Sequence, residues 1–335
     1  IKRGIDAATS GWQVNVNEGI FTEQLHITTN NLTIGGVSKS TVTVKAPASV
    51  PLYFTSGTNQ NHPVIFVDGV NQFTMNNVTI DGDGKGNANY RFQGIGFWNS
   101  GGTLTNVDVY NIIDTPFSGA QHGVAVYAHN NTNGPYTVAC TNMVIDDYQK
   151  NAMALSGTGL TIALDNITTI GAGPTSVTAQ NGIQVAYGAS GTITNSNVSG
   201  NNYSGSGWSS AGILLYQSGT VNISNTTVTD NYVGIDVNDC DGSISNSTVS
   251  NQNSESWDGI YLRKYQNTPM TFNVTGVTIT GHGKTDSWGI LVRANTGTIT
   301  SSITQCQVSN WGLGVYTREI RSEERRVGKE CRSRW

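Results

Sequence analysis

The sequence predicts an all-β chain folded as a single-stranded, right-handed parallel β-helix with three strands per coil and about ten coils. Three observations support this fold class. A glycine-led apolar tetrad recurs along the chain at intervals of between 22 and 30 residues. Short runs of Val, Ile and Thr alternate with Gly- and Asn-rich turns, a pattern typical of many short strands. Only 12% of the residues are charged and 36% are hydrophobic, which argues against intrinsic disorder.

The tetrad is the first strand of each coil. One example is Gly94-Ile95-Gly96-Phe97, and in later coils the first and third positions after the glycine are apolar, as Ile235 and Val237 are. Because side chains alternate along a strand, these positions point inward and the second and fourth point outward. A minimum spacing near 22 residues with a variable excess indicates a fixed coil with loops of different length. The tetrads begin at Gly94, Gly123, Ala152, Gly182, Gly212, Gly234, Gly259, Gly289 and Gly312.

Two further strands complete each coil. The second carries an apolar residue preceded by Thr or Ser, from Thr74-Met75 to Thr298-Ile299. The third follows a short turn rich in Asn, as in Asn77-Val78-Thr79-Ile80. Asn tolerates the left-handed backbone that so tight a corner demands, and stacked Asn side chains can hydrogen-bond along the ladder. One coil cannot bury its own apolar residues, so neighbouring coils must stack.

The two ends of the chain differ from the repeat. Within residues 1–10, Ile1 to Thr9 predicts an amphipathic capping helix, and residues 1–317 form one β-helix domain. Residues 318–335 (REIRSEERRVGKECRSRW) have a different composition and no strand periodicity. This segment resembles the adaptor or vector read-through that ends many metagenomic reading frames, so we expect a non-native tail. The alternative is a basic tail that binds nucleic acid or a membrane.

Charge and cysteine usage exclude several classes of function. The formal net charge is −4, and the tail holds seven of the 18 basic and four of the 22 acidic residues, so residues 1–317 are near −7. That balance argues against nucleic acid as a partner. No apolar run reaches the roughly 18 residues that a membrane span needs. Cys140, Cys240 and Cys306 fall in different coils and form no CxxC, which indicates small buried residues rather than a zinc site or a disulfide framework.

The segment from Gly4 to Gly36, GIDAATSGWQVNVNEGIFTEQLHITTNNLTIGG, resembles the opening of the pectate-lyase-like superfamily. The likeness extends over nearly all of residues 1–317. The superfamily includes pectate lyases, polygalacturonases, pectin methylesterases and many uncharacterised secreted right-handed β-helix proteins. The resemblance therefore implies the fold, an extracellular or cell-surface location in bacteria, and polysaccharide as the partner. It implies no single activity, because this fold hosts many functions.

Ionisable residues gather on the first strands of three consecutive coils. They are Asp236, Asp239 and Asp241 on one coil, Arg263 and Lys264 on the next, and Arg293 on the third. Adjacent coils bring such groups within about 5–10 Å of one another. In the enzymes that the chain resembles, this strand carries the catalytic face. The predicted catalytic residues are Asp236, Asp239, Arg263, Lys264 and Arg293.

Three interpretations of this cluster stay open. Asp236, Asp239 and Asp241 could bind calcium, which takes several oxygen ligands and is the one cofactor we expect. The resemblance to lyases then implies Arg263 as the base beside the metal. Alternatively, Asp236 and Asp239 share general acid and base duties, as in glycoside hydrolysis. The third interpretation is a ladder of surface ion pairs, each contributing about 0–1 kcal/mol.

Aromatic residues form a second signal. Trp208, Trp257, Trp288 and Trp311 each lie just before the glycine of a tetrad. Aromatic faces in such loops commonly stack on sugar rings, although the same rings can pack over the corner of a coil. With outward-pointing tyrosines they predict a polysaccharide groove along coils 212–316. The predicted binding residues are Trp208, Tyr216, Trp257, Tyr261, Trp288, Trp311 and Tyr316.

These features predict a secreted carbohydrate-active protein that binds a polysaccharide and, as an enzyme, cleaves it as a lyase or a glycoside hydrolase. A non-catalytic, adhesin-like glycan-binding protein is the first alternative, because no complete catalytic motif is found. An ice-binding or structural rod is a more remote alternative, suggested by the regular column from Thr74 to Thr298. Parallel strands select β-branched residues in any case.

Overall fold

The computed structural model describes residues 1–132, 134–251, 253–254 and 256–319. The chain divides into two compact units, Ile1–Ile170 and Gly171–Trp335. Within each unit, short strands pair in parallel with the strands of the next coil, so the fold is the right-handed parallel β-helix that the sequence predicts. Among the described residues, no helix is long and apolar enough to cross a membrane.

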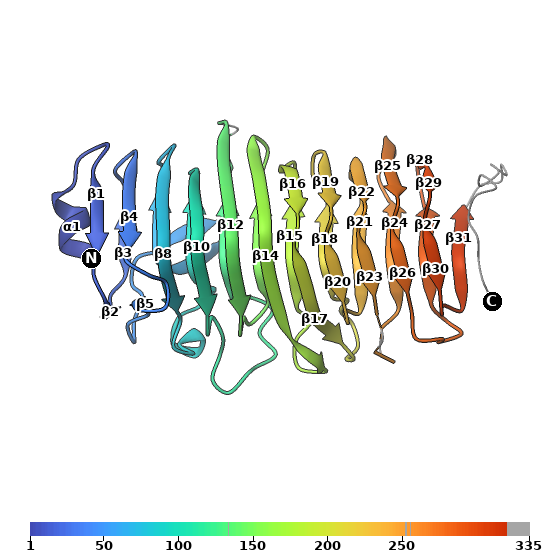
Figure 1. The fold of residues 1–335 in the computed structure, drawn as a ribbon, viewed down its shortest axis with the longest axis horizontal. Coiled ribbons are helices and arrows are strands. Elements are labelled where there is room, and N and C mark those ends of the chain that lie inside the picture. Colours follow the sequence, from blue (N-terminus) through green and yellow to red (C-terminus); the bar gives the residue numbers. More distant parts are fainter. Residues whose placement is uncertain (133, 252, 255, 320–335) are drawn as a thin grey trace. The chain divides into compact units, whose positions relative to one another are not determined.

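A short helix opens the first unit. α1 (Lys2–Ala7) buries Ile5, which is 5% exposed, and the Lys2 backbone N–H donates to the carboxylate of Glu23 at 3.2 Å. Figure 1 shows α1 beside β1 (Gln13–Val16), at the start of the first unit. A helix thus lies within residues 1–10, the segment for which the sequence predicts a capping helix.

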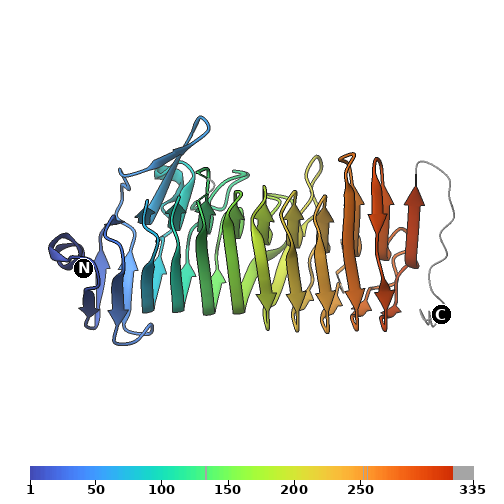
Figure 2. The ribbon, with the colours of Figure 1, turned by 90° about the horizontal axis from the view of Figure 1, so that it is seen from above.

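The first unit has two sets of strands. The first strands of its coils pair in chain order and are β3 (Leu25–Ile27), β7 (Asn59–Asp68), β9 (Phe92–Trp98), β11 (Val124–His129) and β13 (Asn151–Ser156). The other strands are β2 (Gly19–Thr22), β4 (Leu32–Gly36), β5 (Val42–Lys45), β8 (Phe73–Asp81), β10 (Gly102–Tyr110), β12 (Tyr136–Asp146) and β14 (Leu160–Thr175). A 3-10 turn, η1 (Gly86–Ala88), lies between β8 and β9. Strand β6 (Phe54–Ser56) pairs antiparallel with the start of β7, and Figure 2 shows this blue hairpin standing out from the stack.

Asparagines make the tight corners of the first unit. β8, β10, β12 and β14 each bend at one left-handed Asn, with φ between 54° and 59° at Asn77, Asn106, Asn142 and Asn166. The side-chain Nδ2 of Asn106 donates to Oδ1 of Asn77 at 3.1 Å, Asn142 donates to Asn106, and Asn166 donates to Asn142 at 3.0 Å. The predicted asparagine ladder is therefore confirmed, and we call these four residues the corner ladder.

The second unit repeats the same coil. Its first strands are β15 (Asn181–Ala186), β18 (Ala211–Tyr216), β21 (Val233–Asn238), β24 (Asp258–Lys264), β27 (Trp288–Ala294) and β31 (Leu313–Glu319). The other strands are β16 (Ser190–Thr194), β17 (Asn197–Tyr203), β19 (Val221–Ser224), β20 (Thr227–Thr229), β22 (Gly242–Ser245), β23 (Thr248–Ser250), β25 (Pro269–Thr275), β26 (Thr278–Thr280), β28 (Thr298–Thr300), β29 (Ile303–Thr304) and β30 (Gln307–Ser309).

Side chains alternate along the first strands as the tetrad predicts. Ile235, Val237, Ile260 and Leu262 point into the coil and are 0% exposed. The residues between them lie on the outer face of the strands, which is where the candidate site is found. Cys140, Cys240 and Cys306 are buried free thiols, as expected, whereas Cys331 lies outside the described residues.

The last described strand extends beyond the predicted domain boundary. In β31, Arg318 pairs with Arg293 of β27, one residue past position 317. Residues 320–335, which make up most of the expected non-native tail, lie outside the described residues.

Candidate functional site

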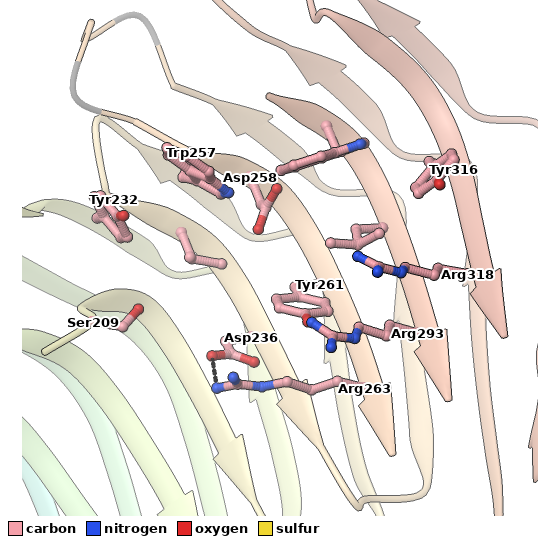
Figure 3. Close-up of a pocket in the computed structure, with 13 residues that line it drawn as sticks. Ser209, Tyr232, Asp236, Trp257, Asp258, Tyr261, Arg263, Arg293, Tyr316 and Arg318 are labelled. Atoms are coloured by element: carbon pink, nitrogen blue, oxygen red, sulfur yellow. Dashed lines mark hydrogen bonds and ion pairs between the residues drawn. The ribbon is translucent and has the colours of Figure 1, made fainter. Parts of the chain in front are cut away.

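A cavity of about 370 Å³ lies on the outer face of the first strands in the second unit (Figure 3). Its walls combine two carboxyl groups, a column of arginines and a row of aromatic rings. The lining residues are Ser209, Tyr232, Val233, Asp236, Trp257, Asp258, Tyr261, Arg263, Trp288, Leu291, Arg293, Tyr316 and Arg318.

The two carboxyl groups come from neighbouring strands. Asp236 points outward from β21, and Asp258 is the first residue of β24. Register places Asp258 beside Val233 and Tyr261 beside Asp236, so the two acids are related diagonally across adjacent coils. Although they face the cavity, Asp236 is only 3% exposed and Asp258 only 1%. Such burial makes the charged form of each acid costly.

The environment separates the proton affinities of the two acids. Burial raises the pKa of Asp236 to about 6, although the Arg263 guanidinium opposes the shift. Burial, reinforced by the charge of Asp236, raises the pKa of Asp258 to about 8 against the opposing effects of Arg263 and the Trp288 backbone N–H. Between about pH 6 and pH 8 the pair therefore holds one proton, which resides on Asp258 while Asp236 is ionised.

Each acid also has an oxygen with no protein partner. Oδ1 of Asp236 and Oδ1 of Asp258 are buried and accept no hydrogen bond from any described residue. Buried polar atoms without a partner are uncommon in native proteins. Both acids line the cavity, so these two oxygens belong to residues of its wall and have unused hydrogen-bonding capacity.

A ladder of buried amides holds the backbone of Asp258. The side-chain Nδ2 of Asn251 donates to the carbonyl oxygen of Asp258 at 2.9 Å, and its Oδ1 accepts the Asn231 backbone N–H at 3.2 Å. One coil earlier, Nδ2 of Asn201 donates to Oδ1 of Asn231 at 3.0 Å. All three asparagines are 0% exposed. The start of β24 is thus fixed to the two preceding coils rather than to a surface loop.

Arginines form the second wall. Arg263 of β24, Arg293 of β27 and Arg318 of β31 occupy the same register, so one guanidinium leaves each coil. Nη2 of Arg263 donates to Oδ2 of Asp236 at 2.5 Å, whereas Nε of Arg293 donates to Oδ1 of Asn295 at 2.9 Å. Strand spacing of roughly 4.8 Å sets the step of this arginine column. Guanidinium groups bind carboxylate and other planar anions in a bidentate manner.

Tyr261 stands between two of these arginines. The Arg263 guanidinium lies 5.1 Å from the centre of the Tyr261 ring, and Figure 3 shows the phenol directed toward Arg293. Burial raises the pKa of Tyr261, although a hydrogen bond with Arg293 opposes the shift. The phenol is therefore protonated at neutral pH and can donate a proton or a hydrogen bond.

Aromatic rings form the third wall. Neighbouring ring centroids lie 6.4 Å apart from Tyr232 to Trp257, 6.0 Å from Trp257 to Trp288, and 6.4 Å from Trp288 to Tyr316. We call these four residues the aromatic row. Nε1 of Trp288 is buried without a hydrogen-bond partner among the described residues. A row with one ring per coil offers flat apolar surfaces of the kind on which sugar rings stack.

Seven of the predicted site residues meet in this cavity. They are Asp236, Trp257, Tyr261, Arg263, Trp288, Arg293 and Tyr316. All of them come from the outer face of the first strands or from the residues that lead into those strands.

Asp239 and Lys264 do not line the cavity, and their predicted catalytic role is not supported. Their side chains are 1% and 2% exposed and form an ion pair, with Lys264 Nζ 2.6 Å from Asp239 Oδ1. The same oxygen accepts the backbone N–H groups of Tyr265 and Gln266. Burial raises the pKa of Asp239, but these donors outweigh burial and lower it overall. Asp239 has a left-handed φ of 55°, so it belongs to the corner after β21 and has a structural role there.

The carboxylates predicted to bind calcium are not brought together. Asp236 is paired with Arg263, Asp239 with Lys264, and Oδ1 of Asp241 accepts the Thr271 backbone N–H at 2.6 Å. In the part of the chain that the structure describes, no three His, Cys, Asp or Glu side chains form a group that could hold a metal ion. Calcium takes roughly six to eight oxygen ligands, so this donor set does not fit it.

Three predicted binding residues lie outside the cavity. Trp208 is 63% exposed, and Tyr216 packs edge-on against Tyr187 with ring centroids 5.5 Å apart. The Trp311 ring lies against Gly259 and Gly281, where an added Cβ would come within 3.2 Å of it or closer. The Trp311 ring therefore packs over a corner of the coil in this structure.

The sequence prediction missed Asp258, Tyr232 and Arg318. A signal for Asp258 did exist, because one register position runs through all the first strands of the second unit. That position holds Asn181, Ala211, Val233, Asp258, Trp288 and Leu313. Asp258 is the one ionisable residue in this column of described residues, and an acid in an otherwise uncharged column points to a special role.

Comparison with known proteins extends the description of the fold. No family model and no curated protein matches the chain. Among solved structures, the A-module of the Azotobacter vinelandii mannuronan C-5 epimerase AlgE4 matches with a TM-score of 0.57 and 15% identity, covering 100% of this chain and 95% of that one. The AlgE6 A-module from the same organism gives 0.54 and 15%, with 96% and 95% covered. The GH136 lacto-N-biosidase from Eubacterium ramulus gives 0.55 and 12%, with 89% and 62% covered. At such identities the likeness establishes the fold, which these proteins share with this chain.

Proposed function

We propose that this β-helix is a carbohydrate-active enzyme, a glycoside hydrolase that cleaves a polysaccharide bearing anionic groups. The observation that carries the proposal is the pair of buried acids, with Asp258 protonated and Asp236 ionised near neutral pH. One protonated and one ionised carboxyl group is the combination that glycoside hydrolysis needs. The similar structures support a carbohydrate substrate, because they are a mannuronan epimerase and a lacto-N-biosidase by name.

Each acid has a defined role in the proposed reaction. Asp258 gives its proton to the glycosidic oxygen as the bond from that oxygen to the anomeric carbon breaks. Asp236 accepts a proton from a water molecule whose oxygen forms the new bond to the anomeric carbon. The net change is addition of one water across the glycosidic bond, and exchange with solvent returns the proton from Asp236 to Asp258. Arg263 keeps Asp236 ionised and fixes its orientation.

The other walls of the cavity bind the substrate. The aromatic row offers stacking surfaces to successive sugar rings. Arg293 and Arg318 offer cations to anionic substituents, and both line the cavity. A polymeric substrate agrees with the expected extracellular or cell-surface location, which remains a prediction.

A second reaction is favoured by the position of Tyr261. Arg263 and Arg293 flank this phenol, and a uronate carboxylate bound to the two arginines would have an acidified neighbouring C–H bond. Asp236 would then remove that proton, the bond to the leaving oxygen would break, and Tyr261 would protonate the leaving oxygen. This β-elimination leaves a double bond in the uronate, whereas hydrolysis adds water across the glycosidic bond and gives two saturated sugar products.

The experiment uses the full chain and a panel of acidic and neutral polysaccharides, with and without added calcium. Reducing ends and the ultraviolet absorbance of unsaturated uronate are followed together. We expect reducing ends without absorbance, a bell-shaped pH profile with limbs near pH 6 and pH 8, and no need for calcium.

Variants then assign the chemistry to the acid pair. Asp258→Asn and Asp236→Asn should each lower the rate by about 10²-fold or more. Asp286→Asn is the matched control, because Asp286 is exposed in the same unit and does not line the cavity. Absorbance that grows with cleavage would establish the elimination instead. Binding without any product would establish a non-catalytic glycan-binding protein, and full activity in both acid variants would exclude this site.

A further inference from the structure

The outer face of the second unit changes charge at the acid pair. One register position reads Ala186, Tyr216, Asn238, Arg263, Arg293 and Arg318 along six consecutive first strands. The first three of these residues are uncharged and the last three are cationic. The change falls between β21 and β24, the two strands that carry Asp236 and Asp258.

Within the uncharged half, strands β15 and β18 are fully described and carry no ionisable side chain other than Tyr216. Residues 171–229, which include β15 and β18, contain no Asp, Glu, Lys, Arg or His. Next to Asp236, the neighbour on β18 is Leu214, followed by Gln184 on β15. An anionic sugar placed on these strands would meet no counter-ion and would lose hydration against apolar and amide groups, which is unfavourable.

The cationic half has the opposite character. Arg293 makes no ion pair among the described residues, and the hydrogen bonds given above join it to two uncharged groups, the amide of Asn295 and the phenol of Tyr261. Lys284 adds a further cation, with Nζ 4.8 Å from the Trp257 ring. An anionic substituent near Arg293 would gain a charge-assisted hydrogen bond, whereas an uncharged sugar there would leave the cation without an anionic counter-ion.

We propose that the substrate is a glycan in which an uncharged segment is joined to an anionic segment, and that the junction lies at the acid pair. The uncharged sugars occupy the β15–β18 side and the anionic sugars the β24–β31 side. Assignment of the junction as the bond that is cleaved rests on the proposed hydrolase function, but the binding preference does not. The anionic group is a uronate carboxylate or a sulfate ester, because both match the guanidinium geometry.

The spacing of the coils agrees with this arrangement. Strands lie roughly 4.8 Å apart, which is close to the advance of one pyranose in an extended chain, so a glycan running across the strands presents about one sugar per coil. The anionic segment therefore spans at least two sugars, one facing Arg293 and the next facing Arg318.

The test measures binding with the full chain carrying Asp258→Asn, so that turnover does not consume the probe. Four hexasaccharides are compared by calorimetry: all glucose, all glucuronate, three glucose followed by three glucuronate, and the reverse order. We expect one of the two mixed hexasaccharides to bind at least about tenfold more tightly than the other three. A matched probe with sulfated glucose in place of glucuronate separates the two sources of negative charge.

Two further variants locate the preference. Arg293→Ala should lower the affinity for the preferred mixed hexasaccharide by about tenfold and leave the all-glucose probe unchanged. Tyr216→Arg extends the cationic column by placing a guanidinium on the uncharged half, so it should raise the affinity for the all-glucuronate probe. The proposal is overturned if all-glucuronate binds as tightly as the better mixed probe, or if both mixed probes bind equally. If the protein shows the binding preference but cleaves no polysaccharide, only the proposed hydrolase function is wrong. If it cleaves a polysaccharide but binds the four hexasaccharides without this preference, only the present inference is wrong.

Discussion

Replacing Asp258 by Asn should stabilise the protein, and the gain should grow with pH. Asn has nearly the same shape and can accept the Trp288 backbone N–H, but it has no proton to lose. In the folded protein, burial and the charge of Asp236 raise the pKa of Asp258 from 3.8 to about 8. Folded Asp258 therefore binds more protons than the unfolded chain between about pH 4 and pH 8. Stability falls as pH rises through that window, and the variant escapes this loss.

The magnitude follows from the size of the shift. A change of about four pKa units corresponds to roughly 6 kcal/mol of stability lost above pH 8. At pH 5 only about one unit lies above the unfolded value, so the loss there is roughly 2 kcal/mol. The variant should therefore gain about 4 kcal/mol relative to the natural chain between pH 5 and pH 9.

The assay is denaturant unfolding of both proteins at pH 5, 7 and 9, followed by tryptophan fluorescence. Ionisable groups common to both proteins contribute equally to the two free energies of unfolding, so they cancel in the difference. If the stacked coils unfold in stages, the denaturant midpoints of the two proteins are compared instead. Asp286→Asn serves as the control, because removal of an exposed carboxylate should give the same small difference at every pH. Parallel stability profiles for the natural chain and Asp258→Asn would refute the argument, since they would mean that Asp258 is not held protonated.

Three further predictions concern the neighbours of the acid pair. Asp239→Ala should lower the free energy of unfolding by about 3–5 kcal/mol at neutral pH, because Lys264 is left buried without its anionic partner. A denaturant midpoint equal to that of the natural chain would contradict the conclusion that Asp239 and Lys264 form a buried ion pair. Arg263→Gln should move the acid limb of the pH–rate profile upward from about pH 6, since the cation that opposes the raised pKa of Asp236 is lost. An acid limb that stays at the same pH would show that ionisation of Asp236 does not control the rate. Trp257→Ala should weaken oligosaccharide binding, measured by calorimetry, by about 0.5–1.5 kcal/mol. An unchanged affinity would show that the Trp257 ring does not contact the bound oligosaccharide.

The fold was predictable because the same pattern of buried apolar positions recurs in every coil. Every coil must bury the same inward positions, so Ile235 and Ile260 recur in register and both are fully buried. The same alternation locates the outward residues within each strand. Asp236, Tyr261 and Arg293 could therefore be placed on the outer face from their position in the tetrad, and all three line the cavity.

The side chains whose positions differ from the sequence prediction lie where the alternation stops. Asp239 follows β21 at a corner with a positive φ, and its side chain turns toward Lys264 rather than the outer face. Asp258 is the first residue of β24, before the regular alternation of the strand is established, and its direction depends on the preceding loop and on Asn251. Corner geometry depends on contacts with neighbouring coils, which the sequence of one coil does not contain.

The corner ladder has a direction, because each amide after that of Asn77 donates toward the N-terminal coil. Asn166 donates to Asn142, Asn142 to Asn106, and Asn106 to Asn77, so the side-chain dipoles add along the row and each bond polarises the next. The row is therefore unequally sensitive to deamidation. Conversion of Asn77 to aspartate keeps an acceptor where only an acceptor is used, whereas the same chemistry at Asn106 sets two acceptors face to face. Deamidation should therefore weaken the stacking of neighbouring coils at Asn106, Asn142 and Asn166, which all donate, and leave it intact at Asn77.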